Sequence, residues 1–138
     1  MQRYCPEIFL QRALLTHMYA SGWKVREEVR FGVKYFDVVA FDGRAVHGFE
    51  VKIKPSQRAL QQALIYQLAC DYVHVVLGVS APSPTFLAKC ASEGIGVMVV
   101  NGPPDWGLST VLPARKSRHK KYQHWSALVR FAEFQDVS

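Results

Sequence analysis

The sequence predicts an α/β protein with a mixed β-sheet flanked by helices, in the order αβββαβαβ. Three observations lead to this fold class. Residues 23–54 contain three consecutive strand patterns separated by short turns, which predicts an antiparallel meander. Beyond residue 55, helix and strand patterns alternate, and a strand–helix–strand crossover joins parallel neighbours of one sheet. The segments 72–77 and 95–100 are nearly continuous apolar runs, as is typical of buried parallel strands.

The first element is a helix over about residues 6–20. Pro6 suits the first helical position, and Glu7 is favourable in a first turn because of the helix dipole. A glycine, Gly22, follows the end of the pattern. The apolar side chains that recur at helical spacing are Leu10, Leu14 and Met18.

The meander follows this helix. Residues 23–31 alternate with period two and predict the first strand. A second strand is expected over 35–41, and Asp42-Gly43 after it is a strong hairpin turn. The third strand is expected over 46–54.

The second half of the chain alternates helix and strand. Ser56 and Ser83 are suited to cap helices, because a serine hydroxyl accepts a hydrogen bond from a free backbone N–H of the first turn. Gly94 suits a helix end. The predicted elements are a helix over 57–70, a strand over 72–77, a helix from Ser83-Pro84 to Gly94, a strand over 95–100, a short strand near 109–112 and a helix near 122–134.

The 138 residues fit one domain with an uneven charge. Residues 1–112 hold 11 basic and 9 acidic side chains, whereas 113–138 hold 6 and 2. We therefore divide the chain into a core over 1–112 and a basic C-terminal extension over 113–138, in the same domain. The extension carries a basic run beside aromatic residues, and its notable members are Arg115, Lys116, Arg118, Lys120, Lys121, Tyr122 and Trp125. This pattern favours contact with nucleic-acid phosphates, and the alternative is an ordinary solvated segment.

Several classes of protein are excluded. No apolar run reaches the ~18 residues of a membrane helix, and the N-terminus lacks a secretory signal pattern. Three distant cysteines without a CxxC pair argue against a disulfide framework and a cysteine-built zinc site. The five histidines lack zinc-ligand spacing. We expect a cytoplasmic protein with no membrane contact and no organic cofactor.

The chemically informative group is Asp37 on the second strand with Glu50 and Lys52 on the third. Alternate side chains of a strand share a face, so Glu50 and Lys52 point the same way, roughly 6.5–7 Å apart. Cross-strand partners lie about 5 Å apart, which lets Asp37 converge with them. Both acids stand among apolar residues, where a carboxylate is unfavourable unless it is paired or bound to a metal ion.

Two interpretations of this group stay open. A hard cation such as Mg²⁺ takes carboxylate and carbonyl oxygens. It would activate a water and stabilise charge on a phosphate, while Lys52 orients the water or stabilises that charge. The alternative is an ion pair within the sheet, between Glu50 and Lys52 or a basic cross-strand group.

The order of these motifs resembles the PD-(D/E)XK nuclease superfamily, with small Holliday-junction-resolvase-like, RecB-like and MmcB-like members the most similar. The resemblance covers about residues 6–101. Tyr35-Phe36 precedes the acid where many members have proline or a basic residue. The segments that carry the resemblance are YFDVVA at 35–40, GFEVK at 48–52, QQALIYQLACDY at 61–72 and EGIGVMVV at 93–100.

The resemblance implies a restriction-endonuclease-like core and a metal-dependent nuclease that acts on DNA. It implies Mg²⁺ or Mn²⁺ held by Asp37, Glu50 and the Val51 carbonyl, with Lys52 catalytic. Superfamily members often add a glutamate from the first helix or first strand, and a polar group from the helix after the third strand. The candidates for these places are Glu7, Glu27 or Glu28 as the glutamate, and Gln67 as the polar group; for Gln67 the alternative is a buried amide with its own partner.

The expected function is therefore hydrolysis of DNA phosphodiesters, with branched or single-stranded DNA as the candidate substrates in DNA repair or processing. Lys34 and Lys54 are further candidates for DNA contact, and a nuclease that makes two cuts would have reason to form a homodimer. The alternative is a nuclease-fold module without turnover that binds nucleic acid or a partner protein.

Overall fold

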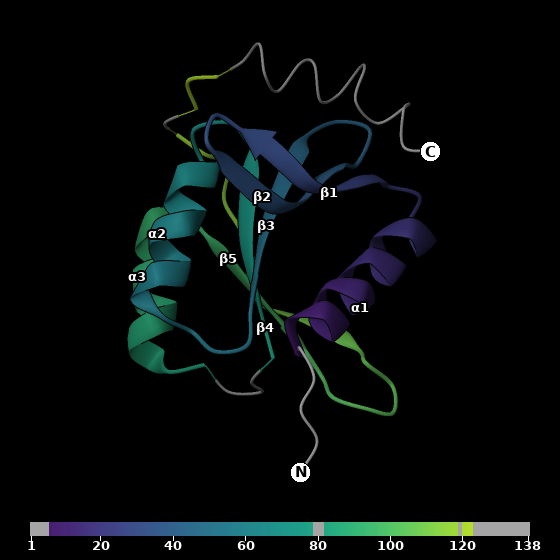
Figure 1. Ribbon diagram of the computed structural model, residues 1–138. Helices are drawn as coiled ribbons and strands as arrows, with labels where there is room; N and C mark the ends of the chain where they lie inside the picture. The colour runs from purple at the N-terminus through teal and green to yellow at the C-terminus, as the bar shows by residue number, and fades with distance from the viewer. Residues whose placement is uncertain (1–5, 79–81, 119, 123–138) are drawn as a thin grey trace.

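The structure is a computed structural model that describes residues 6–78, 82–118 and 120–122. The described elements confirm the predicted α/β class, a mixed sheet with flanking helices (Figure 1). In chain order they are α1 (Pro6–Ala20), β1 (Lys24–Phe31), β2 (Lys34–Phe41), β3 (Val46–Lys52), α2 (Gln57–Tyr66), β4 (Tyr72–Leu77), α3 (Pro84–Glu93), β5 (Gly96–Val100) and β6 (Leu108–Leu112).

The strands lie in the sheet in the order in which they follow along the chain. β1, β2 and β3 form the predicted antiparallel meander. β4 is parallel to β3, β5 is parallel to β4, and β6 returns antiparallel to β5. Because α2 and α3 are successive crossovers of the same hand, they cover one face of the sheet, and α1 covers the other (Figure 1).

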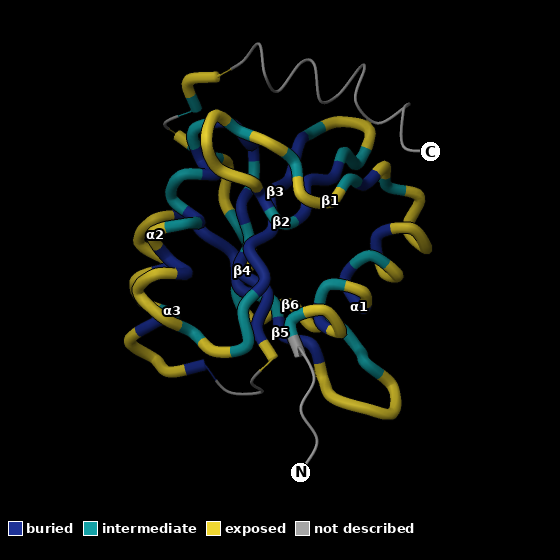
Figure 2. Tube along the Cα trace, in the orientation of Figure 1, coloured by how far each residue is buried: buried dark blue, intermediate teal, exposed yellow. Residues whose placement is uncertain are grey.

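Two layers of apolar side chains hold the helices to the sheet, and the central strands are the most buried segments (Figure 2). On one face Leu14 of α1 packs against Phe49 and Val51 of β3. On the other face Tyr66 of α2 packs with Phe36 of β2. β3 is thus enclosed on both sides, which explains why six of its seven residues are buried although it carries a glutamate.

The predicted helix caps and the hairpin turn are confirmed. The Ser56 hydroxyl accepts from the Ala59 N–H at 3.0 Å, and the Ser83 hydroxyl accepts from the Phe86 N–H at 3.2 Å. Gly94 ends α3 with φ +76°, a conformation that glycine adopts without strain. These local signals set the starts of α2 and α3 and the end of α3.

Two predicted boundaries are wrong. α2 ends at Tyr66 and not at residue 70, because the N–H groups of Leu68 and Ala69 bond three residues back, to Ile65 and Tyr66, in a tighter turn. β3 ends at Lys52 and not at residue 54, since Lys52 is the last residue that pairs with β4. The helix predicted near 122–134 falls almost wholly outside the described residues.

Across the described ranges, no helix is both long and apolar enough to span a membrane.

Candidate active site

The site is built where β2 and β3 separate. The two strands pair from Phe41 back to Val38, which lies opposite Phe49, and the ladder stops there. The next residue, Asp37, turns its backbone N–H to the Tyr66 hydroxyl at 2.8 Å. The Asp37 carboxylate instead accepts a hydrogen bond from the Val51 N–H at 2.9 Å. This divergence places the Asp37 and Glu50 side chains together. We call the place where β2 and β3 separate, beyond the Val38–Phe49 pair, the fork.

Tyr66 joins the two strands at the fork. Its hydroxyl accepts from the Asp37 N–H and donates to Glu50 Oε1 at 2.7 Å. Its ring stacks on Phe36 with centroids 3.9 Å apart, and it fits because Gly48 has no side chain. A Cβ at Gly48 would lie 2.6 Å from the Tyr66 ring. Tyr66 is therefore a central residue of the site.

Tyr66 was not among the site residues predicted from the sequence. The signal for it was a tyrosine on the apolar face of a predicted helix, since a buried phenol needs a hydrogen-bond partner. Ala59 and Ala63 precede it on the same buried face of α2. Sequence alone did not show that the partner is Glu50, because this contact depends on how far β2 and β3 separate.

The two acids form a pair with a strong tendency to hold a proton. Burial, and then the neighbouring Asp37 carboxylate, raise the pKa of Glu50 to about 7. Burial also raises the pKa of Asp37, although the hydrogen bond from Val51 and the charge of Lys52 oppose this. Lys52 Nζ lies 3.6 Å from Glu50 Oε2. At neutral pH a divalent cation would therefore compete with a proton for this pair.

Asp37 lines a cleft of about 480 Å³ whose walls include α1 and β1. Glu7 from α1 is on its wall, as predicted from the resemblance, and its charge further raises the pKa of Asp37. Glu27 and Glu28 line the same cleft, and Glu27 Oε1 accepts from Gln11 Nε2 at 2.8 Å. The cleft is thus strongly acidic, as a cation-binding site requires.

Glu28 stands out among these acids. It has a φ of +52°, which is rare for a residue other than glycine. It falls in the gap of the β1–β2 ladder between the pairs Glu27–Val38 and Val29–Phe36. Burial, followed by the charges of Asp37 and Glu27, raises its pKa. The structure therefore brings all three predicted alternatives, Glu7, Glu27 and Glu28, to the cleft that Asp37 lines.

For Gln67 the structure favours the second of the two predicted alternatives, a buried amide with its own partner. Its amide Nε2 donates to the Glu93 backbone carbonyl at 2.8 Å, at the end of α3. It is the residue that caps the end of α2, and its side chain is buried. The position in α2 that contacts the acids belongs to Tyr66.

The residues at the fork fit a small, hard cation. Among the residues described, no three His, Cys, Asp or Glu side chains are grouped to hold a metal ion. Mg²⁺ does not need such a group, because it keeps several waters and is commonly bound by one or two carboxylates. Glu50 supplies a buried carboxyl and Asp37 a half-buried one, and the two repel each other when both are charged. The carbonyl ligand from Val51 stays a prediction, since its N–H is the group seen to bond Asp37.

The basic run divides into two kinds of residue. Lys120 Nζ contacts Asp71 Oδ1 at 2.7 Å with its side chain 9% exposed, and Arg115 donates to the Ala91 carbonyl. Lys120 therefore forms a structural ion pair with Asp71, which corrects its assignment to DNA contact. Arg115 bonds a backbone carbonyl near the end of α3. The remaining predicted DNA contacts in the described part are exposed: Lys34, Lys54, Lys116, Arg118 and Lys121. Trp125 lies outside the described residues.

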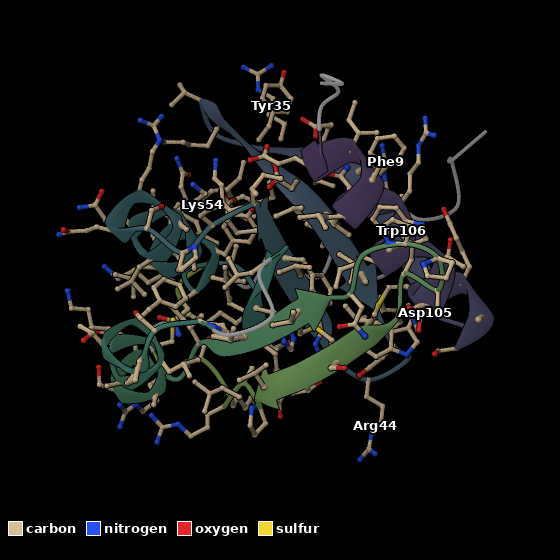
Figure 3. The ribbon with its side chains drawn as sticks, turned by 90° about the horizontal axis from the view of Figure 1, so that it is seen from below. Phe9, Tyr35, Arg44, Lys54, Asp105 and Trp106 are labelled. Carbon is tan, nitrogen blue, oxygen red and sulfur yellow. The ribbon has the colours of Figure 1, made fainter. Side chains whose placement is uncertain are left out.

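A second hollow, of about 850 Å³, lies at the other end of β3 beside His47. His47 bonds Asp42 through Nε2 and His74 through Nδ1, both at 3.0 Å. Burial lowers the pKa of both histidines, that of His74 to about 3. We interpret them as a neutral hydrogen-bonded pair between β3 and β4. Arg44 on the rim of this hollow extends into solvent (Figure 3).

The chain matches none of the protein-family models and none of the curated proteins with which it was compared. Among solved structures it is similar to Hjc, a Holliday junction resolvase from the archaeal hyperthermophile Archaeoglobus fulgidus, at 17% identity. The match covers 78% of this chain and 74% of that chain, with a TM-score of 0.43. Values this low identify neither a family nor an activity.

Proposed function

We propose that the protein is a metal-dependent nuclease that hydrolyses DNA phosphodiester bonds at the fork between β2 and β3. The observation that supports this most strongly is the neighbouring pair of carboxyls of Asp37 and Glu50, held by Tyr66 and flanked by Lys52. An ion pair between Glu50 and Lys52 alone would not need a second, half-buried carboxyl beside Glu50. The acidic cleft in front of Asp37 leaves room for a phosphate and its cation.

In this proposal Asp37 and Glu50 hold Mg²⁺ or Mn²⁺, with a backbone oxygen of Val51 as a further ligand. The bound ion supplies positive charge that lowers the pKa of a water and stabilises the phosphate. Val51 N–H and the Tyr66 hydroxyl fix the orientation of the two carboxyls, so that little rearrangement is needed.

Lys52 supplies the fixed positive charge. Its side chain is on the strand face of Glu50 and is 30% exposed, which allows the ammonium to reach a substrate. There it orients the attacking water or stabilises charge on the phosphate. Glu7 and Glu28 line the entry and are suited to accept protons from water near Asp37.

The test is cleavage by the purified protein of plasmid DNA and of labelled single-stranded and branched DNA, with Mg²⁺, with Mn²⁺ and with chelator. We expect cleavage that the chelator stops and that Asp37→Asn and Glu50→Gln abolish. Glu93→Gln, an exposed glutamate at the end of α3, is the matched control and should cut normally. DNA binding without cleavage under all conditions would favour a binding module and contradict the proposal.

A further inference from the structure

The hairpin tip, residues 29–36, extends beyond the rest of the sheet. β1 and β2 stay paired as far as Phe31 and Lys34, whereas β2 and β3 pair only as far as Val38. Gly32, with φ +63°, allows the tight turn. The tip is therefore a two-stranded ribbon without a third strand beside it, and such a ribbon needs packing on one face to be stable.

One face of the tip has that packing. Phe31 and Phe36 stack with centroids 5.0 Å apart. Phe36 stacks on Tyr66, and Phe31 meets Tyr122 edge to face at 5.1 Å. These aromatic contacts fix the tip to α2 and to the segment after β6. The tip is thus held in place relative to the fork and is able to position a substrate.

The other face of the tip is exposed and lies beside the acids. Neighbouring residues of a strand point to opposite faces, so Tyr35 points away from the face of Phe36. Tyr35 is 58% exposed, lies opposite Arg30, and projects from the hairpin into solvent (Figure 3). Asp37 is only two residues further along β2, or about 6.5–7 Å. Val33 at the turn is 91% exposed.

The side chains on the Tyr35 face of the hairpin tip indicate which part of a DNA substrate this face would bind. A phosphodiester that reaches Asp37 carries its sugars and bases along the neighbouring part of β2, where Tyr35 lies two residues before Asp37. A tyrosine ring stacks on the flat face of a base. In a continuous duplex both faces of each base are already covered, so a face is available only where a base is unpaired.

We propose that Tyr35 stacks on an unpaired base next to the phosphate held at Asp37, and that it thereby selects DNA with an unpaired base at the cleavage position. This inference rests on the proposed function, whose substrate class it narrows. Tyr35 is a specificity residue here and takes no part in bond cleavage.

The test uses Asp37→Asn protein, which should bind DNA without cutting it, and two duplexes that differ only in whether one 2-aminopurine is paired or bulged. We expect the bulged base to lose fluorescence on binding and to be bound more tightly than the paired one. Tyr35→Ala in this background should abolish the quenching and reduce the preference for the bulge by about 5- to 150-fold, the range of one stacked base.

Two further variants control the experiment. Tyr35→Phe keeps the ring and should keep the preference. Tyr19→Ala removes a tyrosine of matched exposure, 57%, from the far end of α1 and should change nothing. The inference is overturned if Tyr35→Ala keeps the preference, if Tyr35→Phe loses it, or if Tyr19→Ala reduces it equally.

Failure of the proposed function is recognised separately, from cleavage by the wild-type protein. If the wild type cuts DNA and Tyr35→Ala keeps the preference for the bulge, the stacking inference alone fails. If Tyr35 is required for quenching and the wild type never cuts, the nuclease proposal fails and the stacking site stands.

Discussion

Replacing Tyr66 by phenylalanine removes one oxygen and both hydrogen bonds at the fork. The Asp37 N–H then loses its acceptor, and Glu50 Oε1 loses its donor. A buried donor left without a partner costs about 1–3 kcal/mol, so we expect the free energy of unfolding to fall by that amount. The ring itself stays, so its stacking on Phe36 should be retained.

The same change should weaken metal binding in a pH-dependent way. The Tyr66 hydroxyl lowers the pKa of Glu50, which even so reaches about 7. Without the hydroxyl, Glu50 holds its proton more tightly, and a cation must displace it. Each unit of increase in the pKa lowers the affinity for Mn²⁺ at pH 7 by about tenfold. Above the new pKa the deficit should disappear.

Calorimetric titration with Mn²⁺ at pH 6, 7 and 8.5 measures this effect, and urea denaturation measures the stability. Tyr35→Phe, which removes a hydroxyl from an exposed tyrosine, is the control and should match the wild type. A deficit in Mn²⁺ affinity that is the same at all three pH values would refute the reasoning about the shared proton. Unchanged stability would refute the assignment of the two hydrogen bonds.

Three further predictions concern pH, the buried ion pair and the basic run. The folded protein binds the Glu50 proton more tightly than the unfolded chain does. The contribution of Glu50 to the free energy of unfolding, measured in chelator, should therefore be largest below about pH 4.5. This contribution should fall by on the order of 3 kcal/mol as the pH rises through 7. Glu50→Gln should flatten this part of the plot of unfolding free energy against pH, measured by urea denaturation, and an unchanged slope of that plot would contradict the assignment. Lys120→Met leaves Asp71 buried without its cation and should cost about 3 kcal/mol in urea denaturation, whereas exposed Lys121→Met should cost little; equal effects would contradict a structural role. Neutralising Lys116, Arg118 and Lys121 together should weaken DNA binding without regard to sequence and flatten the slope of log K against log salt by roughly 0.7–0.9 per contact; a wild-type slope would show that the run does not meet DNA.

The fold followed from short-range patterns in the sequence. Period-two alternation, the Asp42-Gly43 turn and the serine caps are local, and they predicted the meander and the two crossovers. The end of α2 was not predictable in this way. Residues 67–70 continue the helical pattern, and only the tighter hydrogen bonding after Tyr66 ends the helix before them.

The site was predictable to the level of strands but not of side-chain contacts. Spacing on neighbouring strands was enough to bring Asp37, Glu50 and Lys52 together. The contact of Tyr66 with the acids depends on the separation of β2 from β3 and on the space left by Gly48, which are properties of the packed sheet. For the same reason Gln67 was assigned to the site, although its amide bonds Glu93.

The most direct measurement is the single-turnover cleavage rate of Lys52→Ala with saturating DNA and Mg²⁺. In the proposed function Lys52 acts on the reacting phosphate and not on the rest of the DNA, so the rate should fall steeply while DNA affinity and melting temperature stay near wild type. Lys89→Ala, an exposed lysine on α3, should cut at the wild-type rate. Cleavage by Lys52→Ala at the wild-type rate would contradict the assignment of catalysis to this fork.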